Sequence, residues 1–213
     1  RALQEAKEKN EQPAALYDID YLLGVNDETR MGALRFKTDP AADFVNMDNH
    51  RPTPALYQIR ELQHAAALAE LDESSENIKE WMNMLIAPGS SLGGARPKAN
   101  VKDEHGHLLI AKFPSKNDRT DQAAWEYLAY RLARKAGITM THSRIEKING
   151  PYHTFFTKRF DRNGQARIHF ASAMTMTNNN EDTIKDKPAS YLDLAEFIQY
   201  SGSNIQADLH QLW

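Results

Sequence analysis

Residues 91–113 read Ser91-Leu92-Gly93-Gly94-Ala95-Arg96-Pro97-Lys98-Ala99-Asn100-Val101-Lys102-Asp103-Glu104-His105-Gly106-His107-Leu108-Leu109-Ile110-Ala111-Lys112-Phe113, and their pattern indicates how the chain is organised. A loop of small residues leads into a short strand. A turn at 104–106 then precedes an apolar strand from Leu108 to Phe113. Two strand-like runs joined by a short glycine-containing turn are typical of a β-hairpin. We therefore expect a Gly-rich loop that opens directly into a hairpin.

The region after the hairpin predicts a helix, further strands and more helices. Asp118 or Thr120 is the expected cap of a long helix that stops at Gly137. Strand-like segments follow at 143–148 and 152–160, then a turn at 161–164, a third strand-like segment at 167–170, and helices near 191–200 and 205–213. The first of these helices carries an apolar stripe at a helical period, which consists of Trp125, Leu128, Ala129, Leu132 and Ala136.

The region before the loop also mixes element types. A short strand is expected at 31–36, and the proline-rich stretch 40–54 reads as a loop. Residues 55–71 carry apolar side chains at a helical period, and a second helix is expected near 75–85. The fold class predicted for the whole chain is α+β.

Composition narrows the function classes. The 213 residues include 26 Lys and Arg and 29 Asp and Glu, so the formal net charge is −3. This balance argues against a broad basic surface for nucleic acid. The absence of cysteine excludes a disulfide framework and thiolate metal sites. No apolar run is long enough to span a membrane. The chain starts at Arg1 and stops at Trp213 inside an expected helix, so we expect a piece of a longer protein.

The Gly-rich loop is the first candidate binding element. Glycines let the backbone approach a ligand closely, and successive N–H groups can cradle phosphate oxygens. The loop fits neither G-x-x-x-x-G-K-[ST] nor G-x-G-x-x-G. On these residues alone, a purely structural turn into the hairpin remains the alternative.

Lys112 and Glu126 form the second candidate feature. Lys112 interrupts an apolar strand, and a lysine there needs an anion or a path to water. Glu126 lies on the following helix, beside Trp125, and can reach back to that lysine. The alternatives are a solvent-facing lysine and a solvated helix glutamate.

The cluster Lys158-Arg159-Phe160-Asp161-Arg162 is the third candidate. It is either a basic surface or, following two strands, a hinge whose backbone groups bind adenine. The histidines show no metal-binding spacing, and no metal site is expected. Glu181 and Asp182 are placed in a polar loop.

Taken in order, these segments resemble the HipA-like kinases, the toxin components of bacterial toxin–antitoxin pairs. The resemblance covers nearly the whole chain. It rests on 91–98, 109–115, 125–133 with Gly137 behind, and 158–162, and it is supported by 20–25, 31–36 and 168–174.

The resemblance implies a protein-kinase-like fold. Residues 1–160 would form the N-terminal lobe, and 161–213 would begin a helical C-terminal lobe. The implied cofactors are ATP and Mg²⁺, and Glu126 would position the ATP lysine. Ser91 matches a loop serine that some members autophosphorylate, which would repel ATP. The implied ATP-binding residues are Gly93, Gly94, Ala95, Arg96, Pro97, Lys98, Lys112, Lys158, Arg159 and Phe160. A glutamate is common in the family at the position of Lys158, so the side-chain role of this residue departs from the family pattern.

The resemblance further implies a cytoplasmic protein serine/threonine kinase toxin, with an aminoacyl-tRNA synthetase as a candidate substrate. Its partners would be a cognate antitoxin and a protein substrate, with DNA contacted only through the antitoxin and no membrane involved. Phosphoryl transfer needs an Asp followed five residues later by an Asn, and a second Asp for Mg²⁺. No such Asp and Asn pair follows Phe160. We therefore expect no catalytic residue in this chain and place the catalytic residues beyond Trp213. The alternative is a non-catalytic kinase-like module that binds an antitoxin or another partner.

Overall fold

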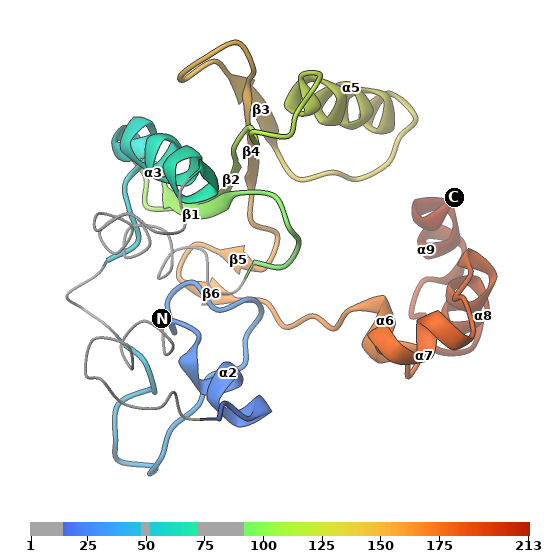
Figure 1. Ribbon diagram of the computed structural model, residues 1–213. Helices are drawn as coiled ribbons and strands as arrows, with labels where there is room; N and C mark the ends of the chain where they lie inside the picture. Colours follow the sequence, from blue (N-terminus) through green and yellow to red (C-terminus); the bar gives the residue numbers. More distant parts are fainter. Residues whose placement is uncertain (1–14, 48–51, 72–91) are drawn as a thin grey trace.

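The computed structural model describes residues 15–47, 52–71 and 92–213 (Figure 1). Its centre is an antiparallel sheet of β1 (Lys98–Lys102), β2 (Leu108–Lys112), β3 (Ser143–Glu146) and β4 (Thr154–Lys158), in the order β1-β2-β4-β3. The predicted hairpin is confirmed, because β1 and β2 are antiparallel neighbours. The turn between them contains Gly106 at φ +78°, a conformation that glycine adopts without steric cost.

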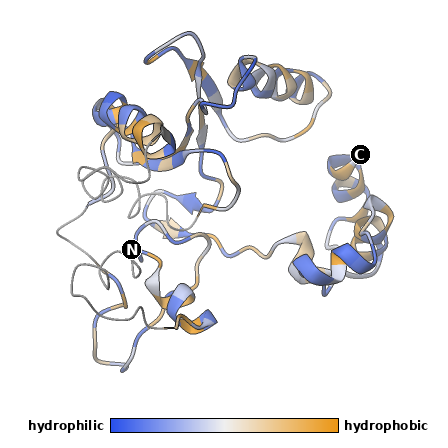
Figure 2. Cartoon of the chain, in the orientation of Figure 1, coloured by the Kyte–Doolittle hydropathy of each residue, from blue (hydrophilic) through white to orange (hydrophobic). Residues whose placement is uncertain are grey.

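One face of the sheet carries the hydrophobic core. The helix expected at 55–71 is confirmed as a 3-10 turn, η1 (Leu56–Gln58), followed by α3 (Ile59–Leu71). Figure 2 shows apolar residues along the side of α3 that faces the sheet. Because strand side chains alternate between faces, every second residue of β1, β2 and β4 points at α3. The buried core cluster is Ile59, Leu62, Ala66, Ala99, Val101, Ala111, Phe113 and Phe156.

The helix α5 (Gln122–Lys135) flanks the other side of the sheet (Figure 1) and contacts β3 and β4. Its cap is Asp121, which accepts a hydrogen bond from Ala124 N at 3.0 Å. The prediction of Asp118 or Thr120 as the cap was therefore wrong by one to three residues. Asp118 is instead used to fix the Gly-rich loop. The predicted stop at Gly137 is confirmed by φ +86°.

Much of the apolar stripe of α5 is exposed to solvent. Trp125, Leu128 and Leu132 of the apolar stripe are 62%, 46% and 57% exposed, whereas Ala123 and Tyr130 are buried. A helical period shows that a stripe exists but not which neighbour it faces. Here the side of α5 that approaches the sheet is the one that carries Glu126, whose carboxylate pairs with Lys112 of β2.

The strand predicted at 31–36 is absent from the described structure. The side chains of Asp161 and Arg162, which come much later in the sequence, form hydrogen bonds with the backbone of this segment instead. Gly32 N donates to Asp161 Oδ2 at 2.7 Å, and Gly32 O accepts from Arg162 Nη1 at 3.2 Å. The local residue pattern of 31–36 gives no information about hydrogen-bond partners. It therefore did not reveal that side chains, rather than a neighbouring strand, pair with the backbone here.

These contacts belong to a buried cluster centred on Arg159 and Asp161, whose side chains are both fully buried. Arg159 Nη2 and Nε donate to the two carboxylate oxygens of Asp161 at 2.5 and 2.8 Å. Arg159 Nη1 also donates to Thr29 O at 2.6 Å and to Asn100 Oδ1 at 2.8 Å. The cluster therefore joins the end of β4, strand β1 and the upstream segment 26–32.

The rest of the chain forms a small hairpin and a set of helices. The hairpin pairs β5 (Arg162–Asn163) with β6 (Ala166–Arg167), so the strand predicted at 167–170 was correct only at its first residue. The predicted terminal helices are confirmed as α8 (Tyr191–Ser201) and α9 (Ile205–Leu212). The helices α2 (Asp18–Gly24), α6 (Ala173–Met176) and α7 (Glu181–Asp186) complete the described elements. Glu181 and Asp182 were expected in a loop, but they open α7 behind the Asn180 cap.

A side-chain amide links α9 to the segment that follows α5. Gln211 Oε1 accepts a hydrogen bond from Thr139 N at 3.0 Å, and Gln211 Nε2 donates to Thr139 O at 2.9 Å. The helix predicted near 75–85 lies outside the described residues. Within the described residues, no helix is both long and apolar enough to cross a membrane.

We predict that Arg159→Ala lowers the free energy of unfolding by about 3–5 kcal/mol, because it leaves the buried Asp161 carboxylate with fewer partners. Urea denaturation followed by circular dichroism measures this change. The matched control is Lys185→Ala, which removes an exposed cation paired with an exposed Asp182 and is expected to leave stability unchanged. A loss in Arg159→Ala no larger than that of the control would contradict the prediction.

Candidate functional site

The candidate site lies on the α5 side of the sheet and centres on Lys112. Lys112 Nζ donates to Glu126 Oε1, so the predicted contact between strand lysine and helix glutamate is confirmed. The two side chains are 32% and 41% exposed. The ammonium group is therefore held in place by one carboxylate while it remains accessible to a solvent-borne anion.

Lys98 lies directly across from Lys112 in the register of β1 and β2, on the same face. Its Nζ donates to Gly93 O at 2.6 Å and to Gly94 O at 2.9 Å. Burial lowers the pKa of Lys98, and the positive charge of Lys112 lowers it further. Two neighbouring ammonium groups repel each other, so an anion bound between them would stabilise both charged forms.

The loop before β1 depends on one glycine more than on the other. Gly94 has φ +91°, and a β-carbon there would lie 3.0 Å from Lys98 Nζ. Gly93 has no such conformation, and a β-carbon there would meet nothing within 4 Å. The backbone at Gly94 thus turns tightly against the Lys98 ammonium group.

Arg96 anchors the loop to the segment that precedes α5. Its Nη1 and Nη2 each donate to one oxygen of Asp118 at 2.7 Å. Asp118 also accepts from Ser115 N at 2.9 Å, and its side chain is only 7% exposed. The Arg96 hydrogen bonds hold the pKa of Asp118 below its usual range, against the effect of burial. This bidentate pair occupies the Nη1 and Nη2 groups that a phosphate would otherwise contact, so Arg96 acts as a loop anchor.

Pro97 and Ala95, the remaining candidate loop residues, have no polar side chain and can contact a ligand or the protein only through their backbone polar groups. Pro97 O accepts from Phe113 N at 2.9 Å, which ties the loop to the end of β2. Ala95 has no side chain beyond the β-carbon and leaves the loop surface open. Ser91, the candidate phosphorylation site, lies outside the described residues.

The segment expected to be an adenine hinge is only partly available to a ligand. The N–H groups of Lys158 and Arg159 already donate to His142 O and Leu108 O at 2.9 and 3.0 Å. The Arg159 side chain is fully buried, so it has a structural role and leaves only the backbone of Arg159 for the expected hinge contact. Within the described part of the chain, no hydrogen bond uses the N–H of Phe160, whose ring is 53% exposed.

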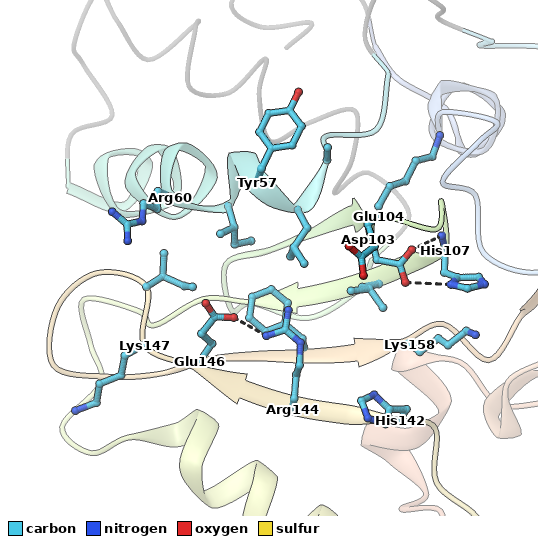
Figure 3. A pocket seen from close by; sticks show the side chains of 17 residues that line it. Tyr57, Arg60, Asp103, Glu104, His107, His142, Arg144, Glu146, Lys147 and Lys158 are labelled. Atoms are coloured by element: carbon cyan, nitrogen blue, oxygen red, sulfur yellow. Dashed lines mark hydrogen bonds and ion pairs between the residues drawn. The ribbon is translucent and has the colours of Figure 1, made fainter.

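The side chain of Lys158 belongs to the other face of the sheet. Phe155 is the register partner of Lys112, and Lys158 is three residues further along β4. Odd spacing along a strand reverses the face. Lys158 accordingly lines a groove beside α3, where Figure 3 shows it with His142. The Lys158 side chain is therefore on the face opposite Lys112, and only the backbone of Lys158 remains for the expected hinge role.

Residues 90–213, more than half of the chain, match the family model of the HipA-like C-terminal domain. This chain belongs to the HipA-like family. No curated protein and no solved structure gives a significant match. The family assignment connects the chain to toxin–antitoxin systems. The HipA-like match spans the Gly-rich loop, both lysines, Glu126 and the segment 158–160.

Sequence reasoning missed one contact that supports this HipA-like site. The carboxylate of Asp121, which caps α5, also contacts His153 Nδ1 and accepts from His153 N at 3.3 Å. The start of α5 is thereby fixed to the turn between β3 and β4. Because α5 carries Glu126, this contact helps to set where that carboxylate meets Lys112. An Asp three residues before Ala124 was a readable capping signal, but its pairing with His153 is a long-range contact.

We predict that Gly94→Ala lowers the free energy of unfolding by about 1 kcal/mol, because an alanine must adopt a left-handed conformation there. Thermal denaturation measures this change. The matched control is Gly93→Ala, which has open space and needs no such conformation. Equal stability of the two variants would show that the loop geometry around Gly94 is not as described.

Proposed function

We propose that this chain is the ATP-binding part of a HipA-like protein serine/threonine kinase. Residues 1–160 would be its kinase-like N-terminal lobe, and 161–213 the start of the helical C-terminal lobe. The observation that carries the proposal is the Lys112–Glu126 ion pair beside the Gly-rich loop. A strand lysine paired with a helix glutamate is the arrangement by which kinases position the phosphates of ATP.

The residues present fit a nucleotide polyphosphate. Lys112 and Lys98 place two ammonium groups on one face, next to the backbone of the Gly-rich loop. The Lys98 ammonium now holds two loop carbonyls, and we propose that phosphate oxygens take over as its partners. The family's Mg²⁺ neutralises phosphate charge when bound. The described residues hold no cluster of three or more Asp, Glu or His side chains suited to a metal.

The adenine ring of ATP would bind beside the C-terminal end of β4, away from the phosphate-binding lysines. We propose that the free N–H of Phe160 donates to the adenine ring and that Lys158 contributes its backbone only. The buried Arg159–Asp161 pair fixes the backbone on either side of Phe160. The distance from the phosphate site to the adenine site is therefore set by the rigid strand rather than by a loop.

The wider activity extends this proposal. The complete kinase would transfer the γ-phosphoryl group of ATP to a serine of a cytoplasmic protein, with an aminoacyl-tRNA synthetase as the candidate substrate. A cognate antitoxin would be its partner and its link to DNA. Phosphorylation of Ser91 would add negative charge to the start of the Gly-rich loop and repel the phosphates of ATP. Mass spectrometry of the full-length protein after incubation with ATP and Mg²⁺ tests the modification, and a persistently unmodified Ser91 would exclude it.

We predict that the 213-residue chain binds a non-hydrolysable ATP analogue with Mg²⁺ and that Lys112→Ala weakens binding at least about tenfold, as expected for loss of a phosphate-binding cation. Isothermal titration calorimetry gives both affinities. Lys135→Ala removes an exposed lysine from the last turn of α5 and should bind like the unaltered chain. Equal affinity of Lys112→Ala and the unaltered chain would refute the proposed site. Complete absence of binding would instead favour a non-catalytic module that binds a partner protein.

We also predict that residues 1–213 alone transfer no phosphoryl group. After Phe160, no Asp is followed five residues later by an Asn, and phosphoryl transfer needs such a pair to orient the hydroxyl group and Mg²⁺. Incubation with radiolabelled ATP and a general protein substrate measures transfer. Phosphorylation that disappears in Lys112→Ala would contradict the prediction, because it would show that this chain contains its own catalytic residues.

A further inference from the structure

A groove of about 920 Å³ lies on the face of the sheet opposite Lys112, between the η1–α3 segment and strands β3 and β4. Figure 3 shows Tyr57 and Arg60 on the helical wall and Arg144 and Glu146 on the strand side. The lining is apolar along the middle and charged at both ends. The apolar lining residues are Leu56, Ile59, Leu109, Ile148 and Phe156.

Hydrogen bonds at both ends of the groove join its helical wall to its strand wall and fix the distance between them. At one end, Lys102 N of β1 donates to Pro54 O at 2.8 Å, just before η1. At the other end, Gln63 Nε2 of α3 donates to Asn149 O at 2.9 Å, and Gln63 Oε1 accepts from Thr154 Oγ1 at 2.9 Å. The groove is therefore preformed, so a ligand would not need to open it.

The lining of the groove carries more positive than negative side chains. The carboxylates of Glu146 and Asp103 are already engaged by Arg144 and His107 (Figure 3). Within the described ranges, Arg60, Lys147 and Lys158 line the groove without an ion-pair partner. Figure 3 places Arg60 and Lys147 on opposite walls at one end and Lys158 towards the other end. An extended anionic chain laid along the groove would meet a cation at each end.

We propose that this groove binds an acidic peptide segment of a partner protein, with an apolar side chain on the floor and carboxylates at Arg60, Lys147 and Lys158. Charge complementarity selects the acidic flanks, and the Phe156 and Ile59 side chains select the apolar anchor. A nucleic acid fits less well, because the floor is apolar and the exposed Glu104 stands at the rim. The proposal does not depend on ATP binding, since the groove and Lys112 are on opposite faces.

The test uses a fluorescein-labelled pool of nine-residue peptides in which aspartate or glutamate alternates with leucine, phenylalanine or tryptophan. Fluorescence anisotropy with the 213-residue chain should show binding that weakens as salt screens the charges. The variant Arg60→Glu with Lys147→Glu should reduce affinity at least about tenfold. The matched control, Lys135→Glu with Lys185→Glu, changes the net charge equally but lies away from the groove, and it should change affinity less than twofold.

Four results would overturn the proposal. These are the absence of binding by the peptide pool, equal losses in the two double variants, tighter binding of a single-stranded oligonucleotide that the groove variant abolishes, and a concentration-dependent dimer that the same variant dissociates. Titration of the groove variant with the ATP analogue separates this proposal from the nucleotide site. Unchanged ATP affinity beside lost peptide binding assigns the loss to the groove alone.

Discussion

The buried ion pair between Arg159 and Asp161 joins the central sheet to the segment upstream of it. Two charges removed from water are costly unless each of their polar atoms is satisfied. Here the carboxylate accepts from Arg159, Arg162 and Gly32 N, while the Arg159 guanidinium also reaches Thr29 O and Asn100. The further partners of the pair come from β1 and the upstream segment, so its polar atoms are satisfied only when these elements are in place. The same contacts explain why residues 31–36 are not a strand.

The pKa of Asp161 reflects two opposing effects in this cluster, burial of the carboxyl group and hydrogen bonding to its charged form. Burial alone would raise it, but the Arg159 hydrogen bonds and the Gly32 N–H outweigh burial and leave the pKa below its usual value. A carboxyl group whose pKa is depressed by folding contributes stability above its unfolded pKa of about 4. That contribution is lost as pH falls through the lower folded value. The cluster is therefore a stabilising element at neutral pH and a weak point in acid.

The alternation of the central strands separates two kinds of surface. Lys98 and Lys112 point to the α5 face, where Glu126 pairs with Lys112, whereas Phe156 and Lys158 point to α3. This division is why Lys158 cannot join the phosphate-binding lysines through its side chain. It also means that a nucleotide and a peptide could occupy the chain at the same time without touching.

Local sequence patterns predicted much of this fold, because hairpins, helix caps and helix ends at glycine are determined by residues that are close together in the sequence. The 98–112 hairpin, the helix at 55–71 and the helix stop at Gly137 are examples. The contact of Lys112 with Glu126 was also predicted from order along the chain. The roles of Arg96 and Arg159 were not predicted, because each depends on a carboxylate or carbonyl brought near by folding. The exposed stripe of α5 was missed for the same reason, since periodicity carries no information about the neighbour.

The most direct test of the nucleotide site is a crystal structure of the 213-residue chain with Mg²⁺ and a non-hydrolysable ATP analogue. We expect phosphate oxygens in contact with Lys112 and the backbone of the Gly-rich loop, with Lys98 released from the carbonyls of Gly93 and Gly94. Adenine should lie beside the backbone of Phe160. A nucleotide bound in the α3 groove, or phosphates that leave Lys112 and Lys98 untouched, would contradict the assignment of ATP binding to this face.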